Sequence, residues 1–111
     1  MSEVTPRFKQ GRVRSRRHLD WVKTLPCSVP GCPNRTIDPH HLTCSPQPKG
    51  RGLRAGDNWV VPLCRIHHDA AYPEGVHHKG DERAWWEARC ADPIRIAERL
   101  ASISRAAGRL P

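Results

Sequence analysis

The sequence predicts a small α+β domain, with two short strands followed by helices and a basic arm ahead of the first element. A chain of 111 residues is long enough for one domain and no more. The two apolar runs with strand character are short and are bounded by turn-forming residues. Signals for helix capping and helical spacing of apolar residues concentrate in the last third of the chain. These observations divide the chain into an arm, residues 1–18, and a folded domain, residues 19–108.

The arm is predicted to be flexible because it is basic and has few apolar residues. Its arginines and lysines include Arg14, Arg16 and Arg17, and this composition cannot bury enough surface to fold. The whole chain carries a formal net charge of +8 and has a pI near 10.0. Such an excess of positive charge attracts a polyanion by releasing counterions, so nucleic acid is the first partner expected.

The folded part is predicted to begin with a short helix or turn over residues 18–25. Prolines and a glycine over residues 26–33 favour a tight turn around Cys27 and Cys32. Strands are predicted over residues 36–43 and 58–63, joined by a loop rich in proline, glycine and basic residues. The second strand runs directly into residues 64–72, which are predicted to form the first turns of a helix.

Two structural helices are predicted after this point. Asp81 can cap a helix that ends at about residue 89 and carries Trp85 and Trp86 into the core, with Cys90 packed on the same helix.

The last helix is predicted to start at Asp92, which is followed by a proline, and to be ended by Gly108. Its Ile96, Leu100 and Ile103 recur at helical spacing and are expected to pack inward.

The cysteine content predicts a cytoplasmic protein. Five cysteines without an apolar N-terminal run argue against a secreted disulfide framework, because one thiol would stay unpaired. Metal-bound thiolates are expected instead. The longest apolar stretch, residues 59–63, is interrupted by Pro62 and cannot span a bilayer, so no membrane partner is expected.

Two ligand pairs predict a structural zinc site. Four residues separate Cys27 from Cys32 and two separate Cys64 from His67, so each pair can bind one ion. An ion shared by both pairs would tie the turn to the helix and stabilise a small core. Two alternatives remain open: the fourth ligand is a neighbour of His67, or the cysteines are free, buried thiols.

A second set of metal-binding side chains lies beside the first. The end of the first strand offers Asp38, His40 and His41, and the helix offers His68. Phosphodiester hydrolysis needs a divalent ion and a neutral histidine that takes a proton from water, and these residues can supply both. Because a strand alternates its faces, His40 and His41 cannot point the same way unless the strand ends or bends there. Their roles as ligand and base are therefore exchangeable.

These motifs resemble those of the HNH endonucleases, also called His-Me finger or ββα-metal nucleases. The likeness is carried by Pro39-His40-His41, by the run GDNWVVPLC over residues 56–64 and by the His-His-Asp run over residues 67–69, and it covers roughly residues 21–86. The chain looks most like the small phage and prophage branch that includes the Ref-type recombination-associated nucleases. The resemblance implies a zinc-stabilised ββα-metal (HNH) core with flanking C-terminal helices.

The resemblance also implies roles for single residues. His41 would be the general base, and Asn58 would brace the loop that carries it. The catalytic metal would be held by His68 together with His40 or Asp38.

The third ligand of that metal is open. Such nucleases often have a further histidine or asparagine on the next helical turn, where this chain has the run DAAY over residues 69–72. His77, His78 or water would take its place.

The expected function is therefore metal-dependent endonucleolytic hydrolysis of DNA, with a structural Zn²⁺ and a catalytic Mg²⁺, Mn²⁺ or Zn²⁺. By resemblance, the products would carry 5′ phosphates, and a phage or recombination protein is a candidate partner. Basic side chains of the loop and the arm are expected to hold the DNA backbone without reading its sequence. These side chains are Lys49, Arg51, Arg54, Arg14, Arg16 and Arg17.

Two other functions fit the same residues. One is a non-catalytic zinc-finger module that binds nucleic acid or an adaptor partner, and it differs from a nuclease in tolerating His41→Ala without loss of activity. The other is a component of a larger phage machine whose nuclease is silent without its partner.

Overall fold

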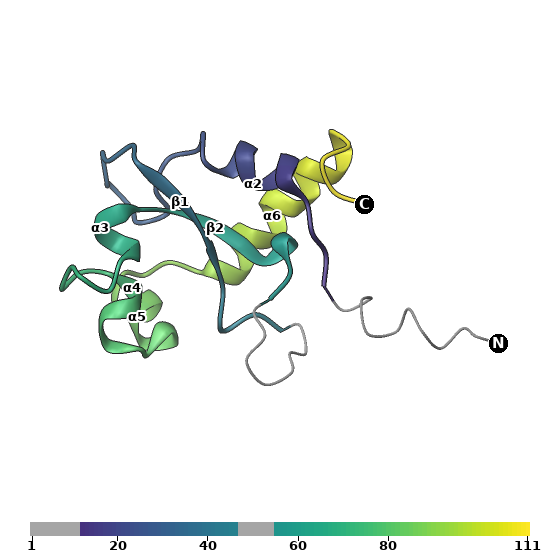
Figure 1. The fold of residues 1–111 in the computed structure, drawn as a ribbon. Coiled ribbons are helices and arrows are strands. Elements are labelled where there is room, and N and C mark those ends of the chain that lie inside the picture. Colours follow the sequence, from purple (N-terminus) through teal and green to yellow (C-terminus); the bar gives the residue numbers. More distant parts are fainter. Residues whose placement is uncertain (1–11, 47–54) are drawn as a thin grey trace.

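The two strands form an antiparallel hairpin at the centre of the molecule (Figure 1). This computed structural model describes residues 12–46 and 55–111. Strand β1 (Ile37–His41) pairs with strand β2 (Val60–Cys64), so that Ile37 lies opposite Cys64 and His41 lies opposite Val60. Both predicted strands are confirmed, although the predicted start of the second strand forms a 3-10 turn, η2 (Asp57–Trp59).

The hairpin tolerates a proline in each strand. Pro39 and Pro62 are register partners, and neither has an N–H to donate to the other. Prolines occur in edge strands, and both strands of a two-stranded sheet are edges. All of β2 is buried, whereas in β1 only Ile37 and His40 are.

Helices cover the hairpin from two sides (Figure 1). Helix α2 contacts both strands, and helix α6 contacts η2 and β2. Three short helices gather at the other end of the hairpin. The helices of the described residues are α2 (Arg16–Val22), α3 (Arg65–His68), α4 (Val76–Lys79), α5 (Glu82–Ala88) and α6 (Pro93–Ala106). None of these helices is long and apolar enough to cross a membrane.

The folded domain begins earlier than predicted. Helix α2 starts at Arg16, because the Ser15 side chain accepts a hydrogen bond from the His18 N–H and caps it. His18 and Val22 of this helix are buried. The last part of the predicted flexible arm, residues 12–18, is therefore ordered against the domain, and residues 1–11 lie outside the described residues.

The helix predicted from residue 64 is confirmed but short. Helix α3 ends after His68, since Asp69 already has extended backbone angles. Helix α4 was not predicted from the sequence. It is a single turn that begins after Gly75 and ends at Gly80, whose φ of 80° lies in the left-handed region favoured by glycine.

The two C-terminal helices are confirmed with their caps. The Asp81 side chain accepts from the Ala84 N–H at the start of α5, and the Asp92 side chain accepts from the Arg95 N–H at the start of α6. Trp86 is 1% exposed and belongs to the core, as predicted.

Two packing predictions on these helices are wrong. Cys90 is exposed, because it lies beyond the end of α5 with a φ of 55°. Ile103 is 44% exposed, because α6 turns its buried face toward the hairpin with Ala97, Leu100 and Ser104 instead.

The buried His18 predicts a pH-dependent stability. Its Nδ1 lies 2.6 Å from the Ser104 hydroxyl, and the ring is 0% exposed. Burial, and then the positive charge of Arg109, lower the pKa of His18 to about 4. Because the folded pKa lies below the unfolded one, the stabilisation is complete above pH 6.5 and is lost as pH falls toward 4.

We expect wild type to lose more stability than His18→Gln as pH falls. The difference between their free energies of unfolding should decrease by about 3 kcal/mol between pH 7 and pH 4. Urea denaturation at a series of pH values measures it. Taking the difference between the two proteins cancels the protonation of the other groups. A difference that stays constant with pH would contradict the prediction.

Candidate metal centres

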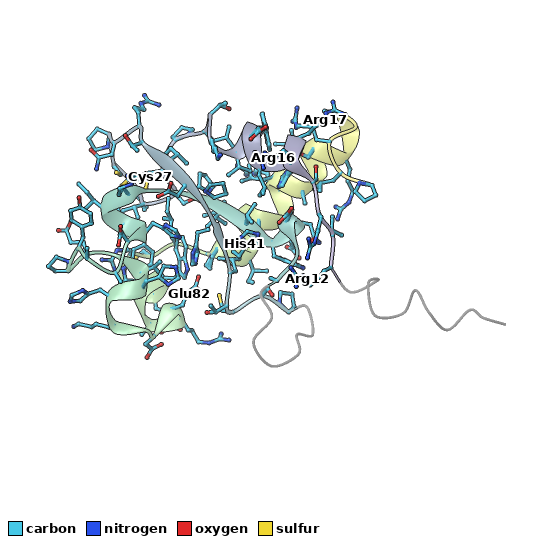
Figure 2. All side chains as sticks on the ribbon, in the orientation of Figure 1. Arg12, Arg16, Arg17, Cys27, His41 and Glu82 are labelled. Atoms are coloured by element: carbon cyan, nitrogen blue, oxygen red, sulfur yellow. The ribbon has the colours of Figure 1, made fainter. Side chains whose placement is uncertain are left out.

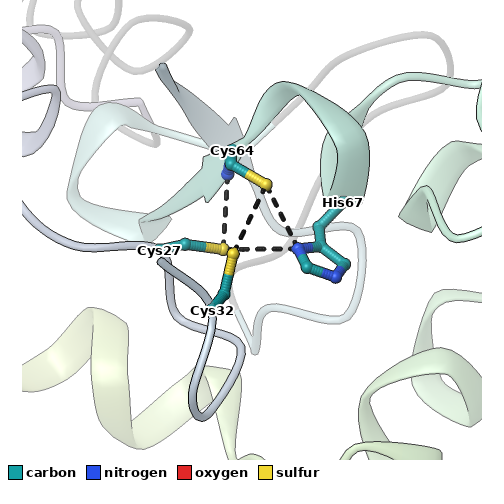
Figure 3. A group of neighbouring side chains, drawn as sticks. All are labelled: Cys27, Cys32, Cys64 and His67. Carbon is teal, nitrogen blue, oxygen red and sulfur yellow. Dashed lines mark hydrogen bonds between the residues drawn. The ribbon is translucent and has the colours of Figure 1, made fainter. Parts of the chain in front are cut away.

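Three segments bring four soft ligands together in what we call the Cys3His cluster. Cys27 and Cys32 come from the turn before β1, Cys64 ends β2, and His67 lies on α3. Figure 3 shows the three sulfur atoms and the imidazole converging on one point. The sequence predicted these four residues as a set, and their ligand atoms all lie within 4.8 Å of one another.

Two of three ligand–ligand distances in the Cys3His cluster match a tetrahedral zinc site, and the third is slightly shorter. Cys32 Sγ lies 3.8 Å from Cys64 Sγ, and His67 Nδ1 lies 3.6 Å from Cys27 Sγ and 3.1 Å from Cys64 Sγ. Ligands at zinc–sulfur and zinc–nitrogen distances in a tetrahedron are about 3.4 to 3.8 Å apart. The cluster could therefore hold a zinc ion with little rearrangement.

Two sulfur atoms of the cluster accept hydrogen bonds, which stabilise the thiolate form that binds a cation. The backbone N–H of Cys64 donates to Cys27 Sγ at 3.4 Å, and the Asn34 amide donates to Cys64 Sγ at 3.5 Å. Burial raises the pKa of Cys64, but the hydrogen bond from Asn34 and those of the neighbouring ligands outweigh it and lower the pKa. Burial raises the pKa of Cys27 to about 11, so this thiol is expected to ionise only when a cation is bound.

A second group, the three-histidine cluster, lies next to the first. His40 is the penultimate residue of β1, His68 follows His67 on α3, and His77 lies on α4. Their ring centroids are 5.2, 5.0 and 4.9 Å apart, so the rings form a nearly equilateral triangle. One nitrogen of each ring lies within 4.8 Å of the others.

The lowered pKa values of His68 and His77 favour neutral, metal-binding rings. Burial, and then the charges of His40 and His77, lower the pKa of His68. Burial, and then the charge of His40, lower the pKa of His77. A metal ion binds the neutral form of imidazole, so the lowered pKa values of these two histidines favour metal binding.

His40 is fixed by a buried carboxylate. Its Nε2 lies 2.8 Å from Glu82 Oε2, and the two side chains are 1% and 6% exposed. The Trp86 indole donates to the same oxygen, while the N–H and hydroxyl of Thr43 donate to Glu82 Oε1. With Nε2 engaged, Nδ1 of His40 is left to face an ion.

Asp38 is not one of the three residues of the three-histidine cluster. Its carboxylate lies 3.5 Å from His68 Nδ1 and 3.7 Å from the Arg65 guanidinium. Asp38 is two residues from His40 and therefore lies on the same face of β1, where its carboxylate contacts α3. His40, not Asp38, is the ligand candidate on β1, and Asp38 orients His68.

His77 was one of three predicted candidates for the remaining ligand, and it completes the cluster. His78 is turned away, with Nδ1 2.9 Å from the Ala70 carbonyl oxygen. Helix α4 therefore supplies the third histidine of the cluster, which the short α3 cannot carry on a further turn.

His41 lies on the opposite face of β1 from His40. Its Nε2 is 2.8 Å from Asp57 Oδ1. Asn58 was expected to brace the segment that carries the base. Among the described residues no hydrogen bond joins it to His41, and its buried Oδ1 has no partner. The backbone of η2 does contact that segment, because the Leu42 N–H donates to the Trp59 carbonyl.

The three-histidine cluster and His41 share one cavity of about 330 Å³. It lies at the end of β1, where the chain leaves the hairpin. Its lining residues are Pro39, His40, His41, Thr43, His68 and His77. A base candidate and a metal-ligand cluster thus open onto the same small space.

The predicted basic residues fall into two sets. Arg14, Arg16 and Arg17 are exposed, and Figure 2 shows Arg16 and Arg17 along α2. Arg16 lies 3.7 Å from the Asp20 carboxylate, and Arg17 donates to the Gly108 carbonyl. The other three, Lys49, Arg51 and Arg54, lie outside the described residues.

The sequence reasoning missed two carboxylates, Glu82 and Asp57. In the sequence, Glu82 is an acidic residue in the first turn of a capped helix, which is a common position for one. Its contact with His40 depends on the fold. Asp57 directly precedes Asn58 in η2, and it is the residue of this turn whose side chain contacts His41.

Comparison with known proteins assigns the chain to a family whose function is unknown. A family described as "Protein of unknown function (DUF968)" matches residues 4–108. Over 68 residues the chain is 41% identical to the "Uncharacterized protein YdfU" of Escherichia coli (strain K12). This segment covers 61% of the chain and 19% of YdfU, so the chain spans only a small part of that relative. No solved structure matches the chain.

Proposed function

The chain belongs to the DUF968 family, and we propose that it is a metal-dependent endonuclease of the HNH type that hydrolyses DNA. One observation carries the proposal. His41 lines the same cavity as His40, His68 and His77 although it lies on the other face of β1, so a proton acceptor and a group of candidate metal ligands open onto one cavity. The antiparallel hairpin followed at once by α3 is also the order of elements that a ββα-metal core requires.

The residues of the three-histidine cluster fit a divalent metal ion. Their nitrogens converge, and the buried Glu82 orients His40. Three imidazoles suit Zn²⁺ and other transition ions better than Mg²⁺, which prefers oxygen ligands. A divalent ion bound there would supply positive charge to the scissile phosphate and the leaving oxygen.

His41 is the proposed general base. It is not part of the three-histidine cluster, and its contact with a carboxylate favours accepting a proton. His40 is 1% exposed and is held by Glu82, which suits a ligand better than a group that exchanges protons with water. The structure thus favours one of the two exchangeable assignments of these histidines.

The charge of the chain supports a DNA backbone as the partner. The formal net charge of +8 includes arginines on α2 and in the segment that precedes it. Arg12 precedes Val13, whose carbonyl accepts from the Asp57 N–H, so this arginine is held on the side of His41 (Figure 2). Binding through such contacts should weaken steeply as salt rises.

The test is plasmid cleavage by the purified full chain at low salt, with Zn²⁺, Mn²⁺, Co²⁺ or Mg²⁺ added in turn. We expect wild type to convert supercoiled DNA to nicked and linear forms and His41→Ala to lose at least about 10²-fold in rate while still binding DNA. His78→Ala is the matched control, because His78 is a nearby histidine that the cavity does not include.

A zinc-loaded wild-type protein that binds DNA and cuts with none of these metals would contradict the nuclease proposal. The Cys3His cluster and the positive charge would then favour a nucleic-acid-binding zinc module. Cleavage that appears only after a phage recombination protein is added would instead favour a partner-dependent nuclease.

A further inference from the structure

We propose that Asp57 is the positioning residue for His41 and that the chain segment over residues 13–15 holds Asp57 in place. The inference rests on the proposed function, because it concerns the base of that reaction. Asp57 Oδ1 lies 2.8 Å from His41 Nε2, and the two side chains are 15% and 12% exposed. The contact is therefore largely shielded from water, where a hydrogen bond to a charged group is strong.

The Asp57 carboxylate is fixed at both oxygens. Its Oδ2 accepts from the backbone N–H of Ser15 at 2.8 Å. Its own N–H donates to the Val13 carbonyl at 2.7 Å. Rotating the carboxylate away from His41 would break the contact with Ser15, so the orientation of the ring follows from the backbone.

The approach of the two segments depends on a glycine. A Cβ at Gly56 would lie 2.8 Å from the Val13 nitrogen and 2.7 Å from Asn58 Oδ1. Such distances are shorter than van der Waals contact, so any larger residue would push residues 13–15 away from η2. The stretch ahead of α2, which was predicted from the sequence to be part of a basic arm, therefore packs directly against η2.

The contact assigns the proton on the His41 ring. A carboxylate only accepts hydrogen bonds, so the proton of a neutral ring lies on Nε2. The lone pair then lies on Nδ1, which is the atom proposed to take a proton from water. As Nδ1 takes that proton, the water oxygen bonds to phosphorus and the bond from phosphorus to the leaving oxygen breaks, with the leaving oxygen protonated by solvent.

The arrangement can be tested on the ring itself. In protein with ¹⁵N-labelled histidines, we expect the Nε2–H proton of His41 to be observed and to exchange slowly with water, with His41→Gln providing the assignment. Asp57→Ala should lose this signal. Glu98→Gln, which removes an exposed carboxylate on α6, should keep it. Zinc content and near-ultraviolet circular dichroism establish that each variant is folded.

Cleavage kinetics give the second readout. Asp57→Asn, which has the same size as aspartate, should lower kcat by about 10²-fold or more with little change in KM, because a positioning carboxylate acts in the reaction step. The double variant Asp57→Asn/His41→Ala should be no slower than His41→Ala, because Asp57 acts through that ring.

Three results would overturn the assignment: a wild-type ring with its proton on Nδ1, an Nε2–H signal that survives in Asp57→Ala, or wild-type cleavage by Asp57→Asn. Failure of the proposed function gives a different pattern. In that case wild type does not cut DNA, yet the Nε2–H signal is present and is lost in Asp57→Ala, so the positioning contact stands without the nuclease.

Discussion

Loss of zinc from the Cys3His cluster is expected to abolish the fold and, with it, the three-histidine cluster. His67 and His68 are neighbours on α3, and one belongs to each cluster. A helix of four residues has no stability of its own in water, so α3 is expected to depend on a zinc ion bound to His67. Binding of structural zinc is worth about 10 to 16 kcal/mol at neutral pH, which matches or exceeds the total stability of a typical domain.

We expect Cys64→Ser to purify with little zinc, to show no cooperative unfolding transition and to bind no second metal. Zinc content by mass spectrometry and near-ultraviolet circular dichroism measure this. The Trp85 ring lies 6.3 Å from the His67 ring, so the tryptophan signal reports on the cluster. Adding a strong chelator to wild type should have the same effect.

Cys90→Ser is the matched control, because Cys90 is exposed and belongs to neither cluster. It should keep its zinc and its unfolding transition. A Cys64→Ser protein that stays folded and still binds a metal at His40, His68 and His77 would show that the two clusters are independent.

Ligand spacing predicted the Cys3His cluster without knowledge of the fold. Two pairs with short spacing can be recognised locally, since each pair lies in one turn or at one helix start. The predicted alternation along β1 also settled that His40 and His41 face opposite sides. The spacing could not predict which of the two histidines contacts Glu82. That contact joins His40 to a residue 42 positions away in the sequence.

The errors have a common physical origin in contacts that are distant in sequence. The predicted arm ended too late because Ser15 and His18 gain partners in the C-terminal segment, Arg109 and Ser104. Asp57 was not singled out from the sequence, because its carboxylate is placed by the backbone of Val13 and Ser15, which are distant in sequence. Cys90 was placed in the core because α5 was expected to run one residue further than its cap allows.

Glu82→Gln is expected to lower both the stability of the domain and the metal affinity of the three-histidine cluster. The two carboxylate oxygens of Glu82 receive four donors, from His40, Trp86 and the N–H and hydroxyl of Thr43. Burial alone would raise the pKa of this carboxyl, but the hydrogen bond and charge of His40, then Thr43 and Trp86, lower it to about 2. The ionised form is thus the one that the fold stabilises.

A glutamine cannot accept all four hydrogen bonds, because one oxygen becomes an NH₂ group that faces donors. We expect the free energy of unfolding to fall by about 2 to 5 kcal/mol, since unsatisfied buried donors cost about 1 to 3 kcal/mol each. Without its carboxylate partner His40 loses its fixed orientation, and metal affinity should fall about 10 to 100-fold. Urea denaturation measures the first effect, and titration of zinc-loaded protein with Co²⁺ measures the second.

Glu87→Gln on the same helix is the matched control, because Glu87 is exposed and should change neither quantity. The pH dependence separates the carboxylate from mere packing. Since the folded pKa of Glu82 is lowered, its contribution to stability is complete above about pH 4.5 and is lost as pH falls toward 2, so the difference between wild type and Glu82→Gln should shrink over that range. Equal Co²⁺ affinity in wild type and Glu82→Gln would mean that His40 is held by the strand alone, and that the buried carboxylate serves the core and not the metal site.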